Sequence, residues 1–285
     1  MADISIIVPA YRAGRYVQRC LEAIYSQETN EEIIIVDNGS EKPAIRHFLN
    51  KYPEVVFIEN KENRGTSFAR NQALRRAKGD WIVFMDADSY IGEGFLPKLK
   101  KIISSLSSDI GSFSPKILKN ESTIFSCGLF LSSLYRSYNI AAGQNSQKYK
   151  DKFEILGPNT CCGVYRRRAL EQIAKEGKVF DEEFFFLWED FDIALRLKKA
   201  GFKSLFVPEL VCFHKGGSAP IERMQRRYFH FSGRLRLIKK NYKGKRRFFF
   251  FLRSFVYDFS RSLHFFIFNP YRHQAFRDIL SIMRK

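Results

Sequence analysis

Residues 79–89, GDWIVFMDADS, join an apolar run to two acids and give the first indication of the fold. Five apolar residues in a row, Trp81 to Met85, predict a strand that is buried on both faces. Asp86 and Asp88 follow it directly, and carboxylates at a buried strand end need a cationic partner. Ligands of open α/β sheets bind beyond the carboxyl ends of the strands. The stretch therefore predicts a cation at that edge of a sheet.

The first 110 residues alternate between strand-like and helix-like segments. Strands are predicted at ISIIVPAY, EIIIVDNGS, VVFIEN and WIVFMDAD. Helices are predicted after them, at about 15–26, 43–51, 66–77 and 94–106. This alternation is typical of a parallel, doubly wound sheet, so we predict an α/β fold. Polar residues end three of the strands, and they should share one edge: Asp37-Asn38, Glu59-Asn60 and Asp86-Ala87-Asp88.

The later part of the chain is less regular. Residues 111–165 predict mixed strands and loops, and a helix near 190–200 should end at Gly201, which suits a C-cap. The stretch SLFVPELVCFH predicts a pair of late strands around Pro208.

The charge of the chain is concentrated at one end. The formal net charge is +18. Residues 214–285 hold 18 Lys and Arg against 3 acids, or +15, which leaves +3 for residues 1–213. This end should seek anionic partners such as lipid, nucleic acid or phosphate.

Cysteine usage and hydropathy indicate a reducing, aqueous compartment. The five cysteines are odd in number and contain no Cys-x-x-Cys pair, so we expect neither a disulfide framework nor a zinc site. We expect no signal peptide before ISIIVPAY and no spanning helix, since no window of 18 apolar residues lacks charge.

The predicted edge is acidic and lacks a glycine cradle for phosphate. No Gly-x-Gly-x-x-Gly follows the first strand, which disfavours a nicotinamide or flavin enzyme, and no Walker A sequence is present. An acidic site holds a nucleotide diphosphate when a divalent metal lies between them. Mg²⁺ and Mn²⁺ prefer oxygen ligands and bridge carboxylates to phosphates, so either ion is the expected cofactor.

Five segments resemble the family 2 glycosyltransferases, which have the GT-A fold, in the same order over about residues 4–217. The rhamnosyltransferase-like branch is the most similar in character. The segments are SIIVPAYRAGRYVQRCLEAIYSQ, IIIVDNGS, NRGTSFARNQAL, GDWIVFMDADS and FDEEFFFLWEDFDIALRLKKAGF with VPELVCFHKGGS. The resemblance implies transfer of a hexosyl or deoxyhexosyl group from a nucleotide sugar, with inversion by single displacement.

The resemblance also implies roles for individual residues. Asp37 matches the acid that reads the nucleoside base, and the loop under the nucleoside matches Pro9, Ala10 and Tyr11. Asp86 and Asp88 match the Asp-x-Asp motif, where the second acid ligates metal and the first touches ribose or metal. His214 matches a late histidine that completes the metal or diphosphate shell in some members.

The resemblance places the catalytic base in the late helix. Asp190 matches the general base that deprotonates the acceptor hydroxyl, and Glu189 helps to shape that site. An inverting transfer needs a base opposite the leaving group and a Lewis acid on the departing diphosphate.

Several of these residues have structural alternatives. Asp190 also suits a helix N-terminus, and Asp192 lies one turn from Arg196, which indicates a helix pair. Asp37 could form an Asx-type turn, Arg70 could bind diphosphate or brace the sheet edge, and His214 could be a polar strand end. Trp188 could stack on an acceptor sugar or lie in the core. Asn63 is predicted to be a turn residue before Gly65. Cys161 and Cys162 are predicted to be packing residues.

The last 63 residues interleave basic and aromatic side chains. We predict a catalytic domain over 1–217 and a helical extension over 218–285. At helical spacing Arg253, Tyr257, Arg261 and His264 share one face, with Phe251, Phe255, Phe259 and Phe266 opposite or beside it. Docking on an anionic membrane surface is the favoured role, in a cytoplasmic protein at the inner face of the membrane. Packing on the catalytic domain and nucleic-acid binding are the alternatives.

The sequence predicts an inverting, metal-assisted glycosyltransferase acting on a glycan or lipid-linked acceptor. A sugar-nucleotide nucleotidyltransferase is one alternative, although its glycine-rich, Arg-bearing loop is missing after SIIVPAY. A non-catalytic membrane-surface or nucleic-acid binding module is the other, and Asp86, Asp88 and Asp190 argue against it.

Overall fold

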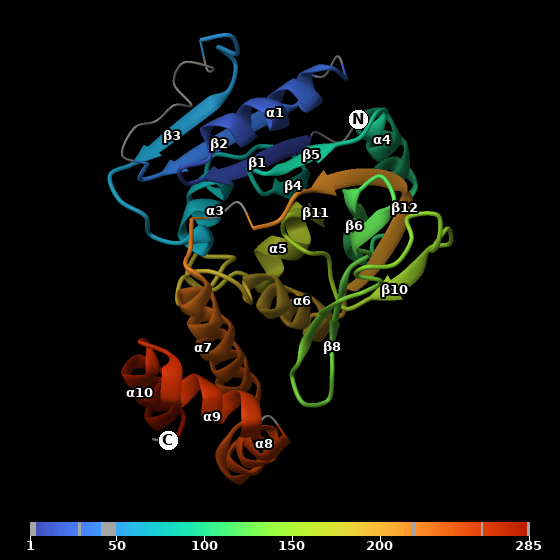
Figure 1. Ribbon diagram of the computed structural model, residues 1–285. Coiled ribbons are helices and arrows are strands. Elements are labelled where there is room, and N and C mark those ends of the chain that lie inside the picture. The colour runs from blue at the N-terminus through green and yellow to red at the C-terminus, as the bar shows by residue number, and fades with distance from the viewer. Residues whose placement is uncertain (1–3, 28–29, 41–49, 218–219, 258, 284–285) are drawn as a thin grey trace. The chain divides into compact units, whose positions relative to one another are not determined.

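A computed structural model describes residues 4–27, 30–40, 50–217, 220–257 and 259–283 (Figure 1). The chain divides into two compact units. Unit 1 comprises Met1–Phe130, Tyr138–Phe185 and Glu189–Ala219. Unit 2 comprises Leu131–Ser137, Phe186–Trp188 and Pro220–Lys285. Each unit is described by itself below.

Unit 1 is built on a ten-stranded sheet with the order β10-β12-β6-β11-β4-β1-β2-β3, in which β5 also pairs with β12 and β7 with β6. The early strands are β1 (Ile4–Ala10), β2 (Glu32–Asn38), β3 (Val56–Asn60), β4 (Trp81–Met85), β5 (Ser89–Ile91) and β6 (Ile110–Asn120). The later ones are β7 (Thr123–Ser126), β8 (Leu129–Leu131), β9 (Ser137–Asn139), β10 (Phe153–Ile155), β11 (Cys162–Arg166) and β12 (Lys203–His214), with β8 and β9 forming a separate pair.

Helices cover both faces of this sheet (Figure 1). They are α1 (Gly14–Tyr25), α3 (Thr66–Leu74), α4 (Phe95–Ser105), α5 (Arg167–Ile173) and α6 (Glu189–Lys199). Successive strand residues face opposite sides. Ile6 and Val8 of β1 pack with α1 and α4 in one apolar cluster, whereas Ile7 packs with α3, α5 and α6 in the other. The two faces therefore carry different helices, and α1 lies opposite α6.

The predicted α/β fold is confirmed, and the first four strands are parallel. β1 pairs in parallel with both β2 and β4, and β2 pairs in parallel with β3, so their carboxyl ends share one edge. The complete sheet is mixed, because β11 runs antiparallel to β4 and β6. This edge is where the predicted site residues meet.

Two predicted elements differ from the structure, and a third lies mostly outside the described residues. The late strand pair was wrong: β12 is one strand whose register shifts between Val207 and Val211. Pro208 lies in that irregularity, where its missing N–H costs no ladder hydrogen bond. α3 ends at Leu74, three residues earlier than predicted. Most of the helix predicted at 43–51 lies outside the described residues.

The end of α6 follows the prediction for Gly201. This glycine has φ +89°, a left-handed conformation that ends helices at low cost. The N–H of Phe202 donates to the carbonyl of Leu197 at 3.1 Å, which satisfies one of the last carbonyls of the helix.

Unit 2 is helical. Its helices are α7 (Arg223–Asn241), α8 (Gly244–Tyr257), α9 (Phe259–Phe268) and α10 (Arg272–Met283). Phe231 of α7 stacks on Phe265 of α9 with centroids 5.0 Å apart, and the Tyr228 hydroxyl donates to Asp278 of α10 at 3.2 Å. Among the described residues, no helix has the length and apolar character needed to cross a membrane.

The predicted amphipathic face falls mostly on side chains outside the described ones. These are Phe251, Phe255, Tyr257, Phe259, Arg261 and His264. The described backbone there is helical on both sides of residue 258, in α8 and in α9.

Candidate active site

The candidate site lies at the carboxyl edge of the central strands of unit 1. β4 ends at Met85, and Asp86 and Asp88 follow it. β5 then pairs antiparallel with the end of β12, with Ser89 opposite His214. This register brings His214 Nδ1 to 3.2 Å from Asp88 Oδ1. The side-chain ligand atoms of Asp86, Asp88 and His214 all lie within 4.8 Å of one another.

The three side chains fit a divalent metal. Carboxylate oxygens suit Mg²⁺ and Mn²⁺, and imidazole suits transition-metal ions. Bonds of about 2.1 Å hold opposite ligands about 4.2 Å apart, so a small rotation of one side chain is enough to close the cluster. Asp88 and His214 are buried and Asp86 is half-buried, so the cluster opens at Asp86. The structure thus brings together the residues predicted to hold metal.

Burial and neighbouring charges shift the pKa values of Asp86 and His214. Burial raises the pKa of Asp86, against the opposing effect of Arg70 and His214. Burial by itself lowers the pKa of His214, but the hydrogen bond to Asp88 and the charges of both aspartates raise it overall. The imidazole also lies 3.0 Å from the Ser89 hydroxyl. These contacts fix the orientation of the His214 ring.

Arg70 connects the cluster to the start of α6. Its side chain is 1% exposed, with one terminal nitrogen 2.8 Å from Asp86 Oδ1 and the other 2.6 Å from Glu189 Oε1. Burial lowers the pKa of Arg70, and the two carboxylates raise it above its ordinary value. Each terminal nitrogen thus contacts one carboxylate, and the predicted nucleotide contact of Arg70 stays a prediction. The contacts favour the bracing alternative.

Asp190 lies in the first turn of α6 and is half-buried. Its Oδ1 accepts a hydrogen bond from the N–H of Phe191 at 2.8 Å. Burial, followed by the charge of Glu189, raises the pKa of Asp190 to about 8. A carboxylate that takes up a proton near neutral pH is suited to general-base chemistry. An acid in the first turn is also favoured by the helix dipole, so the alternative that Asp190 only stabilises the start of α6 is compatible with the same geometry.

Two strained residues precede Glu189. Leu187 has φ +68° and Trp188 has φ +74°, values that residues with a side chain rarely adopt. Each costs about 1 kcal/mol or more, so other contacts must hold this backbone in place. Trp188 supplies such contacts in unit 2, where it is buried, closely approaches Gly233 and packs edge-on against His230. The core alternative for Trp188 is favoured.

Asp37 has one engaged oxygen and one open oxygen. Oδ1 accepts hydrogen bonds from the N–H and hydroxyl of Ser40 at 3.1 and 2.6 Å, which is the predicted turn. Oδ2 is buried and has no hydrogen-bond partner among the described residues. A buried oxygen without a partner is costly, so a ligand donor is expected there. The turn and the nucleoside contact are therefore compatible.

The predicted nucleoside loop lies next to Asp37. Ala10 pairs with Asp37, and Pro9 pairs with Val36, at the ends of the parallel strands β1 and β2. Tyr11 follows and is half-buried. The register of the sheet thus places Pro9, Ala10 and Tyr11 beside the open Asp37 oxygen.

The other residues considered in the sequence make structural contacts. Asp192 forms the predicted helix pair with Arg196 at 2.8 Å. Asn63 forms a turn, because its Oδ1 accepts from the N–H of Gly65 at 3.0 Å. Cys161 and Cys162 are buried, and burial raises the pKa of the Cys161 thiol. Sequence reasoning missed Arg15, Arg19 and Lys215, which line a pocket beside Asp88.

Comparisons with known proteins agree with this architecture. The family model described as Glycosyl transferase family 2 matches residues 5–174, more than half of the chain. The Bacillus subtilis (strain 168) protein described as an uncharacterized glycosyltransferase, YfnE, is 33% identical over 139 residues, covering 47% of this chain and 31% of that protein.

A second relative is covered over more of its length. The Methanococcus voltae dolichyl N-acetyl-alpha-D-glucosaminyl phosphate 3-beta-D-2,3-diacetamido-2,3-dideoxy-beta-D-glucuronosyltransferase is 26% identical over 225 residues, covering 74% of this chain and 66% of that enzyme. The chain thus spans less than a third of YfnE and just under two thirds of the Methanococcus enzyme.

Solved structures confirm the fold. The mannosyltransferase PcManGT from Pyrobaculum calidifontis, solved with GDP-Man and Mn²⁺, matches with a TM-score of 0.60 at 16% identity, covering 99% of this chain and 77% of that one. This likeness confirms the predicted GT-A-type sheet flanked by helices. The rhamnosyltransferase-like branch stays a prediction.

Proposed function

Because the chain belongs to glycosyl transferase family 2, we propose that it transfers a sugar from a nucleotide-sugar donor to an acceptor hydroxyl, with inversion at the anomeric carbon. The observation that carries the proposal is a pair of ion pairs made by the buried Arg70, which link the metal-binding cluster to the start of α6. Arg70 contacts Asp86 on one side and Glu189, the neighbour of Asp190, on the other. Family membership argues against the nucleotidyltransferase alternative.

In the proposed step, Asp190 acts as the base. The acceptor oxygen attacks the anomeric carbon as the bond from that carbon to the diphosphate breaks, and Asp190 takes the acceptor proton. A raised pKa helps the carboxylate to hold that proton, and the base is active only in its ionised form. The nucleoside diphosphate leaves with the bonding electron pair. Single displacement inverts the configuration.

Arg70 and Glu189 position the reacting groups. Asp86 is held by Arg70 at 2.8 Å, and Glu189 by the same guanidinium at 2.6 Å. One buried guanidinium therefore fixes the position of Asp86 in the metal-binding cluster and of Glu189 next to the proposed base. Glu189 is therefore proposed as a positioning residue that shapes the site around Asp190.

The donor would lie along the same edge. Asp86, Asp88 and His214 would hold Mg²⁺ or Mn²⁺, which supplies a Lewis acid for the departing diphosphate. Asp37 would accept a hydrogen bond from the nucleoside base through its open Oδ2, with Pro9, Ala10 and Tyr11 beside it. These roles rest on the adjacency of the three strand ends.

The acceptor is proposed to be a glycan or a lipid-linked sugar. The Methanococcus relative, whose name includes a dolichyl phosphate, supports a lipid-linked acceptor by analogy. The expected group transferred is a hexosyl or deoxyhexosyl unit.

Donor hydrolysis and product stereochemistry test this proposal. Wild-type protein is incubated with UDP-, GDP-, dTDP- and CMP-sugars and Mn²⁺, and release of the nucleotide is measured. With the accepted donor, NMR of the glycoside product should show the anomeric configuration opposite to that of the donor. Retention contradicts single displacement, and no nucleotide release from any donor contradicts the transferase proposal. Asp192→Asn, which changes a neighbouring helix ion pair, is the matched control for Asp190→Asn.

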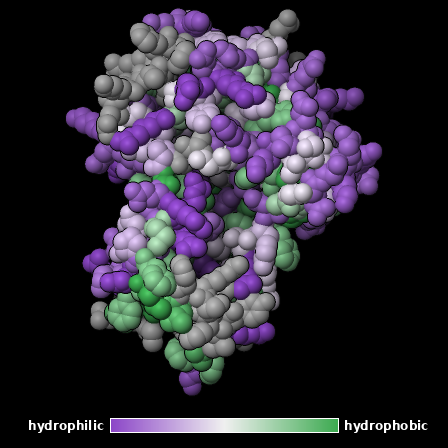
Figure 2. Space-filling model, viewed as in Figure 1, coloured by the Kyte–Doolittle hydropathy of each residue, from purple (hydrophilic) through white to green (hydrophobic). Residues whose placement is uncertain are grey.

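We also propose that residues 1–217 form the catalytic domain and that 218–285 attach the protein to the cytoplasmic face of an anionic membrane. Of the eleven large apolar side chains described as exposed, eight lie between Phe248 and Leu280. Figure 2 shows apolar side chains on the visible face of the α8–α10 region. Lys and Arg near such a surface gain about 1 kcal/mol each from anionic lipid. Nucleic-acid binding has no comparable support.

Vesicle flotation tests the membrane proposal. Full-length protein should float with anionic vesicles at low salt and stay partly bound at high salt, because apolar insertion is not screened. Protein that ignores anionic vesicles at low salt contradicts the proposal, and neutral vesicles are the control. Truncation near residue 222 is a poor test, because it would also remove Gly233 from Trp188 within unit 2.

A further inference from the structure

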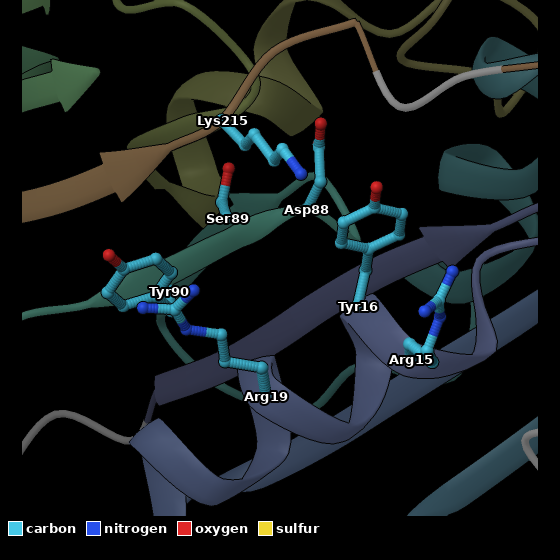
Figure 3. A pocket seen from close by; sticks show the side chains of 7 residues that line it. All are labelled: Arg15, Tyr16, Arg19, Asp88, Ser89, Tyr90 and Lys215. Carbon is cyan, nitrogen blue, oxygen red and sulfur yellow. The ribbon is translucent and has the colours of Figure 1, made fainter. Parts of the chain in front are cut away.

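A pocket of about 280 Å³ lies beside the metal cluster, between α1 and the strand β5 (Figure 3). Arg15, Tyr16 and Arg19 of α1 line one wall, and Asp88, Tyr90 and Lys215 line the others. Asp88 therefore belongs to both the metal cluster and this pocket. A ligand in the pocket would lie next to the metal position.

Three cations from two parts of the chain line this pocket. In Figure 3 the Lys215 ammonium points toward Asp88 and Tyr16, and the Arg19 guanidinium lies against Tyr90. The Arg19 Cζ is 3.9 Å from the Tyr90 ring centroid, and the Lys215 Nζ is 5.7 Å from that of Tyr16. Tyr90 in turn stacks on Phe213 at 4.9 Å, so the outer wall is held in place.

The three cations are exposed, so a ligand reaches them directly from solvent. Arg15 and Arg19 are one turn apart on α1, and like charges at that spacing destabilise a helix. Among the described residues, Arg15, Arg19 and Lys215 form no ion pair with a carboxylate. Residues 1–213 carry only +3 in total, and two of their basic residues, Arg15 and Arg19, line this pocket together with Lys215. An anionic ligand would remove the repulsion between them.

Phosphate is the anion that this chemistry fits. The guanidinium group presents several N–H donors in a fixed plane that match phosphate oxygens, and an ammonium group adds a point charge. A phosphate here could also share the metal held at Asp88, because divalent ions bridge carboxylates to phosphates.

The pocket and the proposed base lie beside helices on opposite faces of the sheet. α1 packs on the sheet face that carries Ile6 and Val8, whereas α6, which begins with Glu189 and Asp190, packs on the opposite face with Ile7. Single displacement requires the base and the leaving group on opposite sides of the anomeric carbon. A phosphate group in this pocket would be directed away from Asp190.

We propose that Arg15, Arg19 and Lys215 form a phosphate subsite on the α1 side of the metal cluster. The inference rests on the proposed glycosyl transfer and adds a binding site to it. The phosphate comes either from the departing nucleoside diphosphate or from a phosphate-bearing acceptor. In Figure 3 the Lys215 ammonium lies beside Asp88, and Arg15 and Arg19 lie on either side of Tyr16, with Arg19 against Tyr90.

The first experiment measures anion binding without turnover. Inorganic pyrophosphate is titrated into full-length protein in EDTA by calorimetry, so that no metal contributes. Arg15→Gln, Arg19→Gln and Lys215→Gln should each weaken binding about tenfold, and the triple variant should abolish it. Lys101→Gln, an exposed cation on α4, is the matched control and should bind like wild type. No binding by wild type, or equal binding by the triple variant, overturns the subsite.

The second experiment identifies the source of the phosphate. With Mn²⁺ present, UDP and GDP are compared with UMP and GMP. A variant that loses affinity for the diphosphates only assigns the pocket to the leaving group. A variant that keeps those affinities but raises KM for a phosphate-bearing acceptor only assigns it to the acceptor. If neither changes, the subsite is overturned. Pyrophosphate binding in a protein without transfer activity would overturn the proposed function and leave the subsite standing.

Discussion

Two regions of the molecule carry charge in opposite ways. The acidic edge of unit 1 gathers Asp86, Asp88, Glu189 and Asp190, and its cation, Arg70, is 1% exposed. The helical part of unit 2 is strongly basic, and eight of its large apolar side chains are open to solvent, with Phe249 65% exposed. In the first region each charge has a fixed geometry set by a partner. In the second, charge and apolar area face outward, as a surface-binding element requires.

Under the proposed functions, the acidic edge carries the chemistry and the helical part of unit 2 attaches the protein to a membrane. Buried charges that hold one another at fixed distances are costly to build and place reacting groups accurately. Exposed charges contribute little to stability and act over longer distances on other molecules. We therefore expect point changes in the acidic edge to have large, specific effects, and changes in the basic surface to have small, additive ones.

The largest expected effect is at Asp88. Asp88→Asn removes a carboxylate from the three-residue cluster and should abolish metal-dependent nucleotide binding and transfer. Calorimetry with a nucleoside diphosphate and Mn²⁺ measures this, and circular dichroism checks that the fold is retained. Equal affinity in wild type and variant would show that Asp88 does not hold the metal.

Asp190→Asn should come next. It should lower kcat by about 10²–10⁴, the usual effect of losing a positioned base, while donor affinity stays within a few-fold. Steady-state kinetics and a donor titration measure the two quantities separately. Asp192→Asn should leave kcat within a few-fold, and comparable turnover in both variants would remove Asp190 from the base role.

The pH profile sharpens the same assignment. The pKa of Asp190 is raised to about 8, so the base form gains population as pH rises toward that value. In the free enzyme kcat/KM should rise about tenfold per pH unit below about pH 8 and then level off. A bound metal adds positive charge and should move this midpoint lower. A profile that is flat from pH 5 to 9 contradicts the assignment.

Removal of the buried cation should mainly affect stability. Arg70→Met leaves two buried or half-buried carboxylates without their partner and should lower the free energy of unfolding by about 3 kcal/mol. The matched control is Lys152→Met, which breaks an exposed pair with Glu209 and should cost less than about 1 kcal/mol. Urea denaturation measures both, and equal costs would contradict the comparison between buried and exposed charge.

The smallest effects are expected on the basic surface. Phe249→Ser and Phe268→Ser each remove an exposed ring from unit 2 and should weaken partitioning into anionic vesicles by up to about tenfold. Thermal stability should change little, because neither ring is buried. Unchanged partitioning in the double variant would show that these rings do not enter the bilayer interface.

Much of the acidic edge was predictable from local sequence. An apolar run followed by Asp86 and Asp88 marks a strand end, and the alternation of strands and helices places several such ends together. The turn at Asp37 and the helix pair between Asp192 and Arg196 also follow from short-range spacing. These features depend on residues close together in the chain, so they can be predicted from one sequence.

Other features needed contacts between distant segments. The split of strands around Pro208 was predicted wrongly because a local pattern cannot distinguish a bend within one strand from a break between two. Arg70 was left between two roles, and its partner Glu189 lies 119 residues later in the chain. The antiparallel insertion of β11 beside β4 is likewise a long-range pairing.

Local residue patterns were enough to predict the strand ends, the acids on them and the excess of positive charge after residue 213. Long-range packing sets which of these groups meet: His214 with Asp88 through the pairing of β5 with β12, Arg70 with Asp86 and Glu189, and Lys215 with the arginines of α1 at one pocket. The physical reason is that residue type and spacing set local backbone geometry, whereas the partner of a charge is set by sheet register and helix packing, which depend on the whole chain.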